Sequence, residues 1–271
     1  PDDVARLSVS DWECLVRQAR QSGLLARLGE RLEAAGSKER IPEPARWHFD
    51  AARTLAARQQ VAVRWEIDRI RAALATLDGP VVALKGAAYV IARLPSAAGR
   101  LFNDVDVLVP RAQLGEAESA LLLAGWHASG VSAYDERYYR RWMHEIPPLR
   151  HVRRSSMLDL HHAILPDTAR HPPATATLLE RIEPVADLPG VFVLGREDRI
   201  LHSAIHLFHD GELPHGLRDL SDLDLLLTAP DNPEDFWPSL LARARELKQE
   251  RALYYALRYA RHFLPTPVPD N

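Results

Sequence analysis

The spacing of the hydrophobic residues changes twice along the chain, and each change marks a boundary between regions. Up to residue 78 the apolar side chains recur with the 3.6-residue period of an amphipathic helix, as at Trp12 and Val16. Short β-branched runs then replace that period, and the helical period returns after residue 165. The pattern predicts an α+β protein, in which a small mixed β-sheet core over 79–165 is flanked by an N-terminal helical region over 1–78 and a C-terminal helical region over 166–271.

The strand and helix signals can be assigned segment by segment. Buried strands are expected where β-branched residues cluster, and helices where apolar residues recur at helical spacing and Gly or Pro ends the run. The expected strands lie at 81–84, 105–109, 126–128, 145–152 and 157–164, and the expected helices of the core at 86–93 and 111–124. In the C-terminal region a hairpin-like segment at 184–194 precedes expected helices at 197–209, 216–229, 234–246 and 249–263.

The composition fits a soluble globular protein and argues against some functions. Of 271 residues 46% are hydrophobic and 26% charged, and 34 basic against 37 acidic side chains leave a net charge of −3. A dedicated duplex-DNA binder usually has a strong basic excess, so we expect no duplex DNA as partner. No apolar run approaches the ~18–20 residues of a membrane span, and the N-terminus lacks the apolar region of a signal peptide. We therefore expect a cytoplasmic protein with no membrane partner.

Cysteine and lysine are both rare, which directs attention to where they occur. The single Cys14 excludes an intramolecular disulfide and a cysteine-based zinc site, and we expect it to be a buried structural thiol. Only Lys38, Lys85 and Lys248 are lysines, and the other basic residues are arginines. Codon bias explains the overall ratio, but Lys85 follows an expected strand directly and merits separate attention.

Asp104 and Asp106 alternate with valines in the second expected strand. Residues two apart in a strand point to the same face, so both carboxylates project together while the valines face the core. Carboxylate oxygens are hard donors that suit one or two Mg²⁺ ions. Such ions can activate a hydroxyl and neutralise the charge of a triphosphate.

Lys85 and Gly86 lie at a turn from strand to helix, in front of these aspartates. A glycine at such a turn lets backbone amides approach a phosphate, and the start of the helix favours negative charge. Lys85 supplies a cation at the turn, and Arg100 supplies a second one in the loop before Asp104. The segment therefore predicts nucleotide binding by Lys85, Gly86 and Arg100.

Together these motifs resemble the DNA-polymerase-β-type nucleotidyltransferase superfamily, and within it a bacterial branch of uncharacterised nucleotidyltransferases. The pattern of that branch is L-K-G, then R-x-x-x-D-h-D-h-L-V (h, hydrophobic), and further on L-D-L-H, which matches residues 158–161 here. The resemblance implies Asp159 as a third carboxylate, with Asp104, Asp106 and Asp159 as catalytic residues and metal ligands. It also implies two Mg²⁺ ions, an NTP substrate, and transfer of a nucleoside monophosphate to a hydroxyl acceptor with release of pyrophosphate.

The resemblance leaves the acceptor open: a small metabolite, a sugar, a protein side chain or an RNA end. Two features depart from the wider superfamily pattern. Ala87 stands where a serine commonly contacts phosphate, and the separation of Gly86 from Asp104 is longer than usual. A catalytically silent relative that only binds nucleotide, or serves as a scaffold, is therefore the alternative function.

Several other polar clusters have competing interpretations. His202, His206 and His209 share a helical face and could form the metal site of a hydrolase, or a wall of the acceptor pocket. Asp222 and Asp224 are interpreted as a polar helix face, although one carboxylate could point into the cleft. Of His161 and His162 we expect only one to approach the site, with His161 facing away from Asp159. Arginines mixed with aromatic residues over 134–154 are either a solvated surface or a surface for RNA, a polyanion or a carbohydrate.

Overall fold

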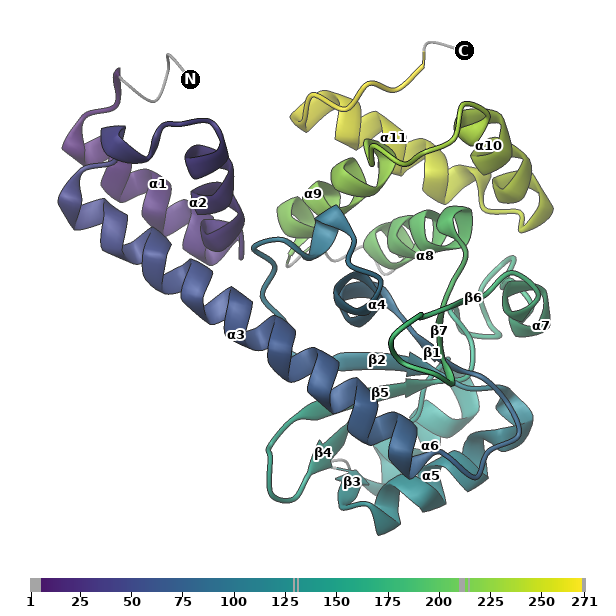
Figure 1. Ribbon diagram of the computed structural model, residues 1–271. Coiled ribbons are helices and arrows are strands. Elements are labelled where there is room, and N and C mark those ends of the chain that lie inside the picture. The colour runs from purple at the N-terminus through teal and green to yellow at the C-terminus, as the bar shows by residue number, and fades with distance from the viewer. Residues whose placement is uncertain (1–5, 129, 131, 210–212, 214, 270–271) are drawn as a thin grey trace.

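The computed structural model describes residues 6–128, 130, 132–209, 213 and 215–269, and consists of N-terminal helices, a central sheet and C-terminal helices (Figure 1). The helices are α1 (Val9–Gln21), α2 (Leu25–Ala34), α3 (Glu43–Ala73), α4 (Lys85–Ile91), α5 (Leu114–Leu123), α6 (Ala133–Trp142), α7 (Thr175–Leu179), α8 (Arg196–His209), α9 (Gly216–Leu227), α10 (Phe236–Glu246) and α11 (Glu250–Phe263). The strands are β1 (Val81–Ala83), β2 (Val105–Leu108), β3 (Trp126–Ala128), β4 (Leu149–His151), β5 (Met157–His161), β6 (Glu183–Pro184) and β7 (Val191–Val193). The expected α+β class with a mixed sheet between helical regions is confirmed.

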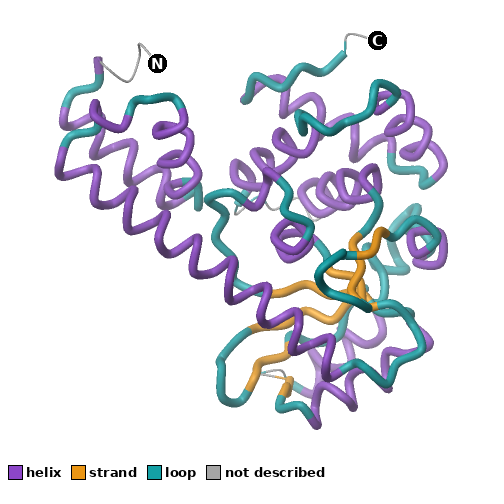
Figure 2. The backbone as a smooth tube through the Cα atoms, viewed as in Figure 1, coloured by secondary structure: helices purple, strands orange, loops and turns teal. Residues whose placement is uncertain are grey.

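The sheet is short-stranded and mixed, and helices cover it from both ends of the chain (Figure 2). Its order is β3-β4-β5-β2-β1-β7-β6, with β1 parallel to β7, β2 parallel to β5, and the other neighbours antiparallel. The valines of β2 are fully buried, as the alternation predicted. The strands β6 and β7 come from the hairpin-like segment expected at 184–194. The sheet therefore includes strands that lie beyond residue 165 in the sequence.

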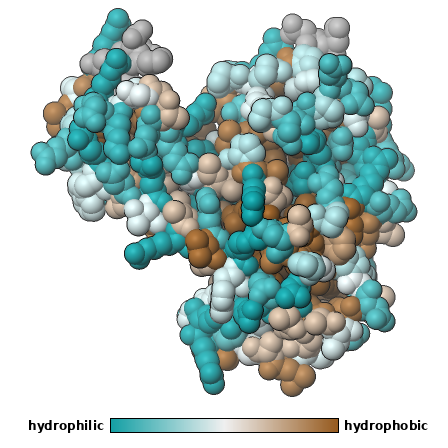
Figure 3. Space-filling model, in the orientation of Figure 1, coloured by the Kyte–Doolittle hydropathy of each residue, from teal (hydrophilic) through white to brown (hydrophobic). Residues whose placement is uncertain are grey.

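Two separate hydrophobic cores stabilise the chain, and the long helix α3 contributes to both. The first half of α3 packs against α1 and α2 through Phe49, whose ring meets Trp12 edge to face at 6.1 Å. The second half contributes Ile67 and Ile70 to the larger core under the sheet, which also includes α4 and α8–α11. In the space-filling view the N-terminal helices form a lobe set apart from the C-terminal helices by a notch (Figure 3).

Two helices were missed in the sequence. α6 begins at a capping box in which Ser132 and Asp135 bond to each other's backbone, and none of its residues is buried. Because its apolar side chains have no core to face, hydrophobic periodicity gives no signal for it. The helix α7 has only five residues, too few for a periodic pattern. No helix in the described part of the chain has both the length and the apolar character needed to cross a membrane.

Candidate active site

Three aspartates lie on the same face of two neighbouring strands. The parallel register of β2 and β5 places Asp106 directly beside Asp159, and neighbouring residues in register point to the same side. Asp104 precedes Asp106 by two residues, just before β2 begins, and therefore shares that face. Asp106 is buried, Asp159 half-buried and Asp104 exposed. The sheet thus brings together three carboxylates that come from two distant segments.

Asp106 is held by two partners that approach the same oxygen. The Nζ atom of Lys85 donates to Asp106 Oδ1 at 2.8 Å, and the Nε2 atom of His161 lies 3.1 Å from that oxygen. Burial disfavours the ionised carboxylate, but the charge of Lys85 and the contact with His161 outweigh it and hold the pKa of Asp106 well below its ordinary value. Asp106 is therefore a carboxylate at neutral pH.

The other two carboxylates have raised pKa values. Burial, followed by the negative charges of Asp106, Glu145 and Asp104, raises the pKa of Asp159 to about 8. Asp104 is exposed as a residue, yet surrounding protein atoms desolvate its carboxyl group, and this desolvation together with the charge of Asp106 raises its pKa too. The charge of Lys85 lowers both pKa values, but burial and the neighbouring carboxylates outweigh it.

The turn between β1 and α4 places Lys85 at the site. Lys85 has a φ of 43°, in the left-handed region that non-glycine residues seldom occupy. The next residue, Gly86, has no left-handed φ, but there is no room for a side chain at its position. A Cβ atom there would lie 2.3 Å from an amino nitrogen of Arg100 and 2.9 Å from the Phe102 ring. Gly86 therefore allows Arg100 to pack against the turn.

Arg100 is a buried, well-anchored side chain. Its Nε atom donates to Asp222 Oδ2 on α9 at 2.7 Å, and the guanidinium lies between the rings of Tyr89 and Phe102, at 5.8 and 5.1 Å from their centroids. Asp222 also forms an ion pair with Arg27 of α2 at 2.7 Å. The interpretation of Asp222 and Asp224 as a polar helix face is wrong, because both are buried.

Glu145 and His161 belong to the site and were missed or misplaced in the sequence. His161 was expected to face away from Asp159, but the two residues are two apart in β5 and therefore point to the same side. Glu145 Oε2 lies 3.3 Å from His161 Nε2, opposite Asp106. An isolated bridge to His161 positions Glu145, and no local motif announces such a long-range contact.

The tightest potential metal-binding group differs from the aspartates predicted in the sequence. Among the described residues, only His144, Glu145 and His161 form a set of three whose donor atoms all lie within 4.8 Å of one another. Burial lowers the pKa of His144 to about 3, so its ring is neutral and can act as a ligand. A set of two imidazoles and one carboxylate suits Zn²⁺ better than Mg²⁺, which prefers oxygen ligands.

Two cavities meet at Asp104. One, of about 260 Å³, lies above the carboxylates, and its lining includes Lys85, Arg100 and Arg218. The other, of about 300 Å³, lies between α3 and the starts of β2 and β5. Asn103 and Asp104 line both cavities. Arg218 is a cation that the sequence analysis did not single out, and its charge acts on Asp104.

The three histidines of α8 do not converge. His202 is buried, His206 lines the cavity of Lys85, and His209 lines a different cavity. Within the described residues they form no group with metal-ligand spacing, so the interpretation as a hydrolase metal site is not supported. Cys14 is half-buried rather than fully buried.

In the arginine and aromatic cluster over 134–154, two arginines contact other parts of the protein, whereas most of the aromatic side chains face solvent. Arg140 pairs with Glu118 on α5, and Arg154 pairs with Glu66 on α3 while its guanidinium covers the rings of Trp65 and Trp126. These contacts are structural, because each guanidinium has a protein partner. Of the aromatic residues of α6, Tyr134, Tyr138 and Trp142 are exposed and Tyr139 is half-buried.

A sheet face with three carboxylates beside a cation-lined turn is typical of nucleotidyl-transferring enzymes, and comparison with known proteins agrees with this class. Residues 8–265 match the family model described as "Uncharacterised nucleotidyltransferase", and the chain belongs to this family. It is therefore an enzyme of the nucleotidyltransferase class. No curated protein matches the chain. Among solved structures it is similar to the antibiotic-resistance factor ANT(2'')-Ia, with 18% identity over 75% of this chain and 97% of that chain and a TM-score of 0.42.

Proposed function

We propose that the protein is a Mg²⁺-dependent nucleotidyltransferase that moves a nucleoside monophosphate from an NTP to a hydroxyl acceptor and releases pyrophosphate. The observation that carries this proposal is the placement of Asp104, Asp106 and Asp159 on one face of β2 and β5, next to a cavity lined by three cations. Family membership supports the reaction class, and the geometry supports the assignment of the residues.

The carboxylates supply the oxygen donors that divalent cations such as Mg²⁺ prefer. Asp159 has a pKa of about 8 because it is buried beside other acidic groups, and a divalent cation at this face would relieve that repulsion. Asp104 and Asp106 would hold two Mg²⁺ ions, and Asp159 would contribute to one of them. When bound, such ions neutralise charge on the triphosphate and lower the pKa of the attacking hydroxyl.

The cations of the smaller cavity suit the triphosphate. The ammonium group of Lys85 donates to Asp106, and the guanidinium of Arg100 donates to Asp222. Arg218 lies on α9 across the cavity and is bonded to the neighbouring Asp219 at 2.9 Å. Together these side chains place positive charge where a leaving pyrophosphate would accumulate negative charge.

The second cavity suits the acceptor. It lies on the other side of Asp104, and in-line transfer requires the acceptor opposite the leaving pyrophosphate. Its wall includes Glu66, which is buried and whose Oε2 atom has no hydrogen-bond partner among the described residues. The volume of about 300 Å³ fits a small metabolite or sugar ring. Once a cation has displaced its proton, the Asp159 carboxylate would be available to accept the proton of the attacking hydroxyl.

The test is to measure the binding of Mg²⁺, Mn²⁺ and a non-hydrolysable NTP to the wild type and to the variant Asp104→Ala/Asp106→Ala. We expect the double variant to lose metal binding and to bind the metal–nucleotide complex more than about 100-fold more weakly, since both principal metal ligands are gone. Asp167→Asn is the control, because Asp167 is an exposed carboxylate paired with Arg111 on the surface. Equal binding in the wild type and the double variant contradicts the proposal.

A catalytically silent relative is distinguished by turnover. Pyrophosphate release from each NTP is measured with a broad panel of hydroxylated acceptors, in the wild type and in Asp159→Asn. Release that depends on the acceptor and disappears in the variant supports transfer. Nucleotide binding with no release for any acceptor identifies a nucleotide-binding protein without transferase activity.

A further inference from the structure

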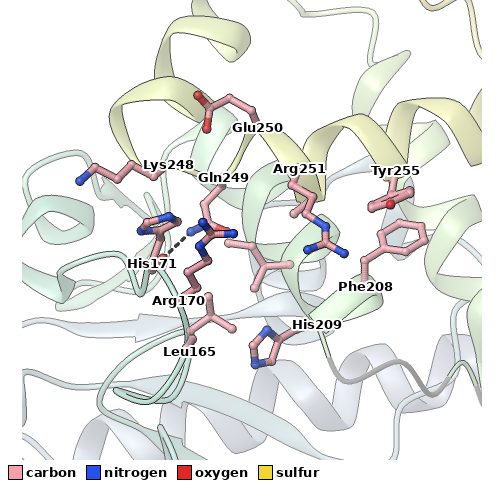
Figure 4. Close-up of a pocket in the computed structure, with 13 residues that line it drawn as sticks. Leu165, Arg170, His171, Phe208, His209, Lys248, Gln249, Glu250, Arg251 and Tyr255 are labelled. Carbon is pink, nitrogen blue, oxygen red and sulfur yellow. Dashed lines mark hydrogen bonds between the residues drawn. The ribbon is translucent and has the colours of Figure 1, made fainter.

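A cavity remote from the three aspartates lies between the end of α8, the start of α11 and the loop over 165–171 (Figure 4). Its volume is about 560 Å³, about twice that of the cavity beside Lys85. Leu165, Ile205 and Phe208 give it an apolar floor. None of its lining residues is shared with the cavity beside Lys85, so a ligand here would be separate from the proposed triphosphate site.

Two exposed arginines line this cavity. Arg170 from the loop and Arg251 from α11 point toward its centre, and the imidazole of His209 lies below them, whereas Lys248 and Glu250 extend away (Figure 4). In the part of the chain that the structure describes, neither Arg170 nor Arg251 forms an ion pair, although the protein as a whole is slightly acidic. Glu250 also lines the cavity, but among the described residues it forms no ion pair with either arginine, and its side chain extends away from them (Figure 4).

The cavity is built from fixed parts. The buried Gln249 donates from Nε2 to the backbone oxygen of His171 at 2.6 Å, and this bond joins the loop to the start of α11. The guanidinium of Arg251 lies 5.8 Å from the ring centre of Tyr255, which packs against Phe208 with ring centres 6.0 Å apart. A pre-organised site loses less entropy when it binds a ligand.

We propose that this cavity binds a small phosphorylated metabolite through its phosphate group. Two arginines can bind the oxygens of a phosphate by paired, charge-assisted hydrogen bonds. A single carboxylate or a neutral ligand offers fewer acceptor oxygens to the two guanidinium groups. A bare phosphate would leave most of the volume empty, so the ligand also carries an organic part, which lies on the apolar floor and against Phe208. The site is independent of the proposed transferase chemistry.

The first experiment locates the ligand by arginine modification. The full chain is treated with phenylglyoxal in the absence of Mg²⁺ and NTP, and modification is mapped by mass spectrometry with inorganic phosphate, glucose 6-phosphate, AMP or neutral glucose present. We expect the phosphate esters to slow modification of Arg170 and Arg251 at least about threefold, while glucose has no effect. Arg245 is the internal control, since it is an exposed arginine on the adjacent α10. No protection by any phosphate compound, or equal protection of Arg245, overturns the proposal.

The second experiment separates a built site from general surface charge. Arg170→Ala/Arg251→Ala is compared with Lys248→Ala, which removes a cation that points away from the cavity, and with Lys85→Ala, which alters the catalytic cavity. We expect the double variant to bind the protecting phosphate ester at least tenfold more weakly and both single variants to bind it within twofold of the wild type. A loss of the same size in Lys248→Ala overturns the proposal.

One further measurement completes the test. Binding of a non-hydrolysable NTP with Mg²⁺ is expected to be unchanged in Arg170→Ala/Arg251→Ala. A parallel loss would place the arginines in the nucleotide site and overturn the separate site. Failure of the transferase proposal would leave the binding result intact, because binding is measured without nucleotide.

Discussion

At the scale of single residues, the charge state of each aspartate depends on its immediate neighbours. Asp106 and Asp159 lie side by side in register, yet their pKa values move in opposite directions. The difference arises because Lys85 and His161 contact Asp106, whereas burial and three nearby acidic groups dominate at Asp159. One carboxylate is thereby kept ionised, and the other is kept protonated at neutral pH until a cation arrives.

Metal binding should therefore depend on pH. Because the pKa of Asp159 is about 8, we expect the affinity for Mg²⁺ to rise between about pH 6 and pH 8, with a proton released on binding. Isothermal titration calorimetry in two buffers of different ionisation enthalpy measures that proton. In Asp159→Asn the released proton and the pH dependence should both be lost. An unchanged pH profile in the variant contradicts the assignment.

The same shift predicts a stability effect in the absence of metal. The folded-state pKa of about 8 lies above the ordinary value of 3.8. Between these two pH values the folded protein holds a proton that the unfolded chain has released, so the free energy of unfolding falls as the pH rises through this range. Below about pH 4 the group is protonated in both states and contributes no difference. We expect Asp159→Asn to raise the thermal unfolding temperature at about pH 8 and to leave it unchanged at about pH 4. A variant less stable at both values contradicts this prediction.

His161 should act by positioning Asp106. Its Nε2 atom lies 3.1 Å from Asp106 Oδ1 and 3.3 Å from Glu145 Oε2, whereas its Nδ1 atom has no partner among the described residues, so the N–H group that faces Asp106 is on Nε2. We expect His161→Ala to weaken Mg²⁺ binding about 10–100-fold, the usual cost of losing a group that orients a metal ligand. His161→Gln retains an N–H donor and should recover part of that loss. Equal effects of both substitutions would indicate a packing role only.

At the scale of elements, the site depends on where short segments begin and end. The parallel register of β2 and β5 aligns Asp106 with Asp159, and a shift of one residue would turn Asp159 to the opposite face. The turn before α4 then brings Lys85 to Asp106, at the cost of a left-handed backbone conformation of the order of 1 kcal/mol. Strained backbone at a turn beside a carboxylate cluster is consistent with a functional position.

Gly86 tests whether this turn is packed as tightly as the structure indicates. A Cβ atom at Gly86 would displace the Arg100 guanidinium, which Asp222 and the Phe102 ring hold in place. We expect Gly86→Ala to weaken NTP binding about tenfold and to destabilise the fold by about 1–3 kcal/mol. Gly115→Ala on α5 is the matched control, because a Cβ atom there meets nothing within 4 Å and alanine favours a helix. Equal nucleotide affinity in both variants contradicts the prediction.

At the scale of the whole molecule, the N-terminal helices connect to the site through buried charges. Arg27 of α2 bonds to the backbone oxygens of Ser96 and Ala98 and pairs with Asp222, which also holds Arg100. The path joins one hydrophobic core to the other across the notch seen in Figure 3. The N-terminal region thus supports the loop that carries Arg100, although none of its residues lines the cavity beside Lys85.

Removal of Arg27 should therefore affect both stability and binding. We expect Arg27→Ala to reduce the free energy of unfolding by about 3 kcal/mol, because breaking a buried ion pair leaves Asp222 less compensated, and to weaken NTP binding through Arg100. Arg31→Ala on the same helix is the control and should change stability by no more than about 0.5 kcal/mol, since Arg31 is exposed. Denaturant unfolding and nucleotide titration measure the two effects. Unchanged nucleotide affinity in Arg27→Ala would confine its role to the fold.

The sequence alone predicted the elements whose signals are local. The valines of β2 and the amphipathic pattern of α8 to α11 depend on periodic burial, so the order of helices and strands could be inferred. The motif around Lys85 and Asp104 and the resemblance that it carries also lie in short segments. α6 could not be predicted from hydrophobic pattern, because its signal is a capping box and not a buried face.

Only the tertiary structure decided which distant groups meet. Glu145, Arg218 and Arg27 join the site or its support through contacts with residues far away in the chain, and no local pattern distinguishes them from ordinary surface charges. The pKa values are likewise properties of the fold, because burial and neighbouring charges, and not residue type, set them. The sequence determined which chemical groups are available and which face of each strand they occupy, and the packing of strands and helices determined their neighbours and their charge.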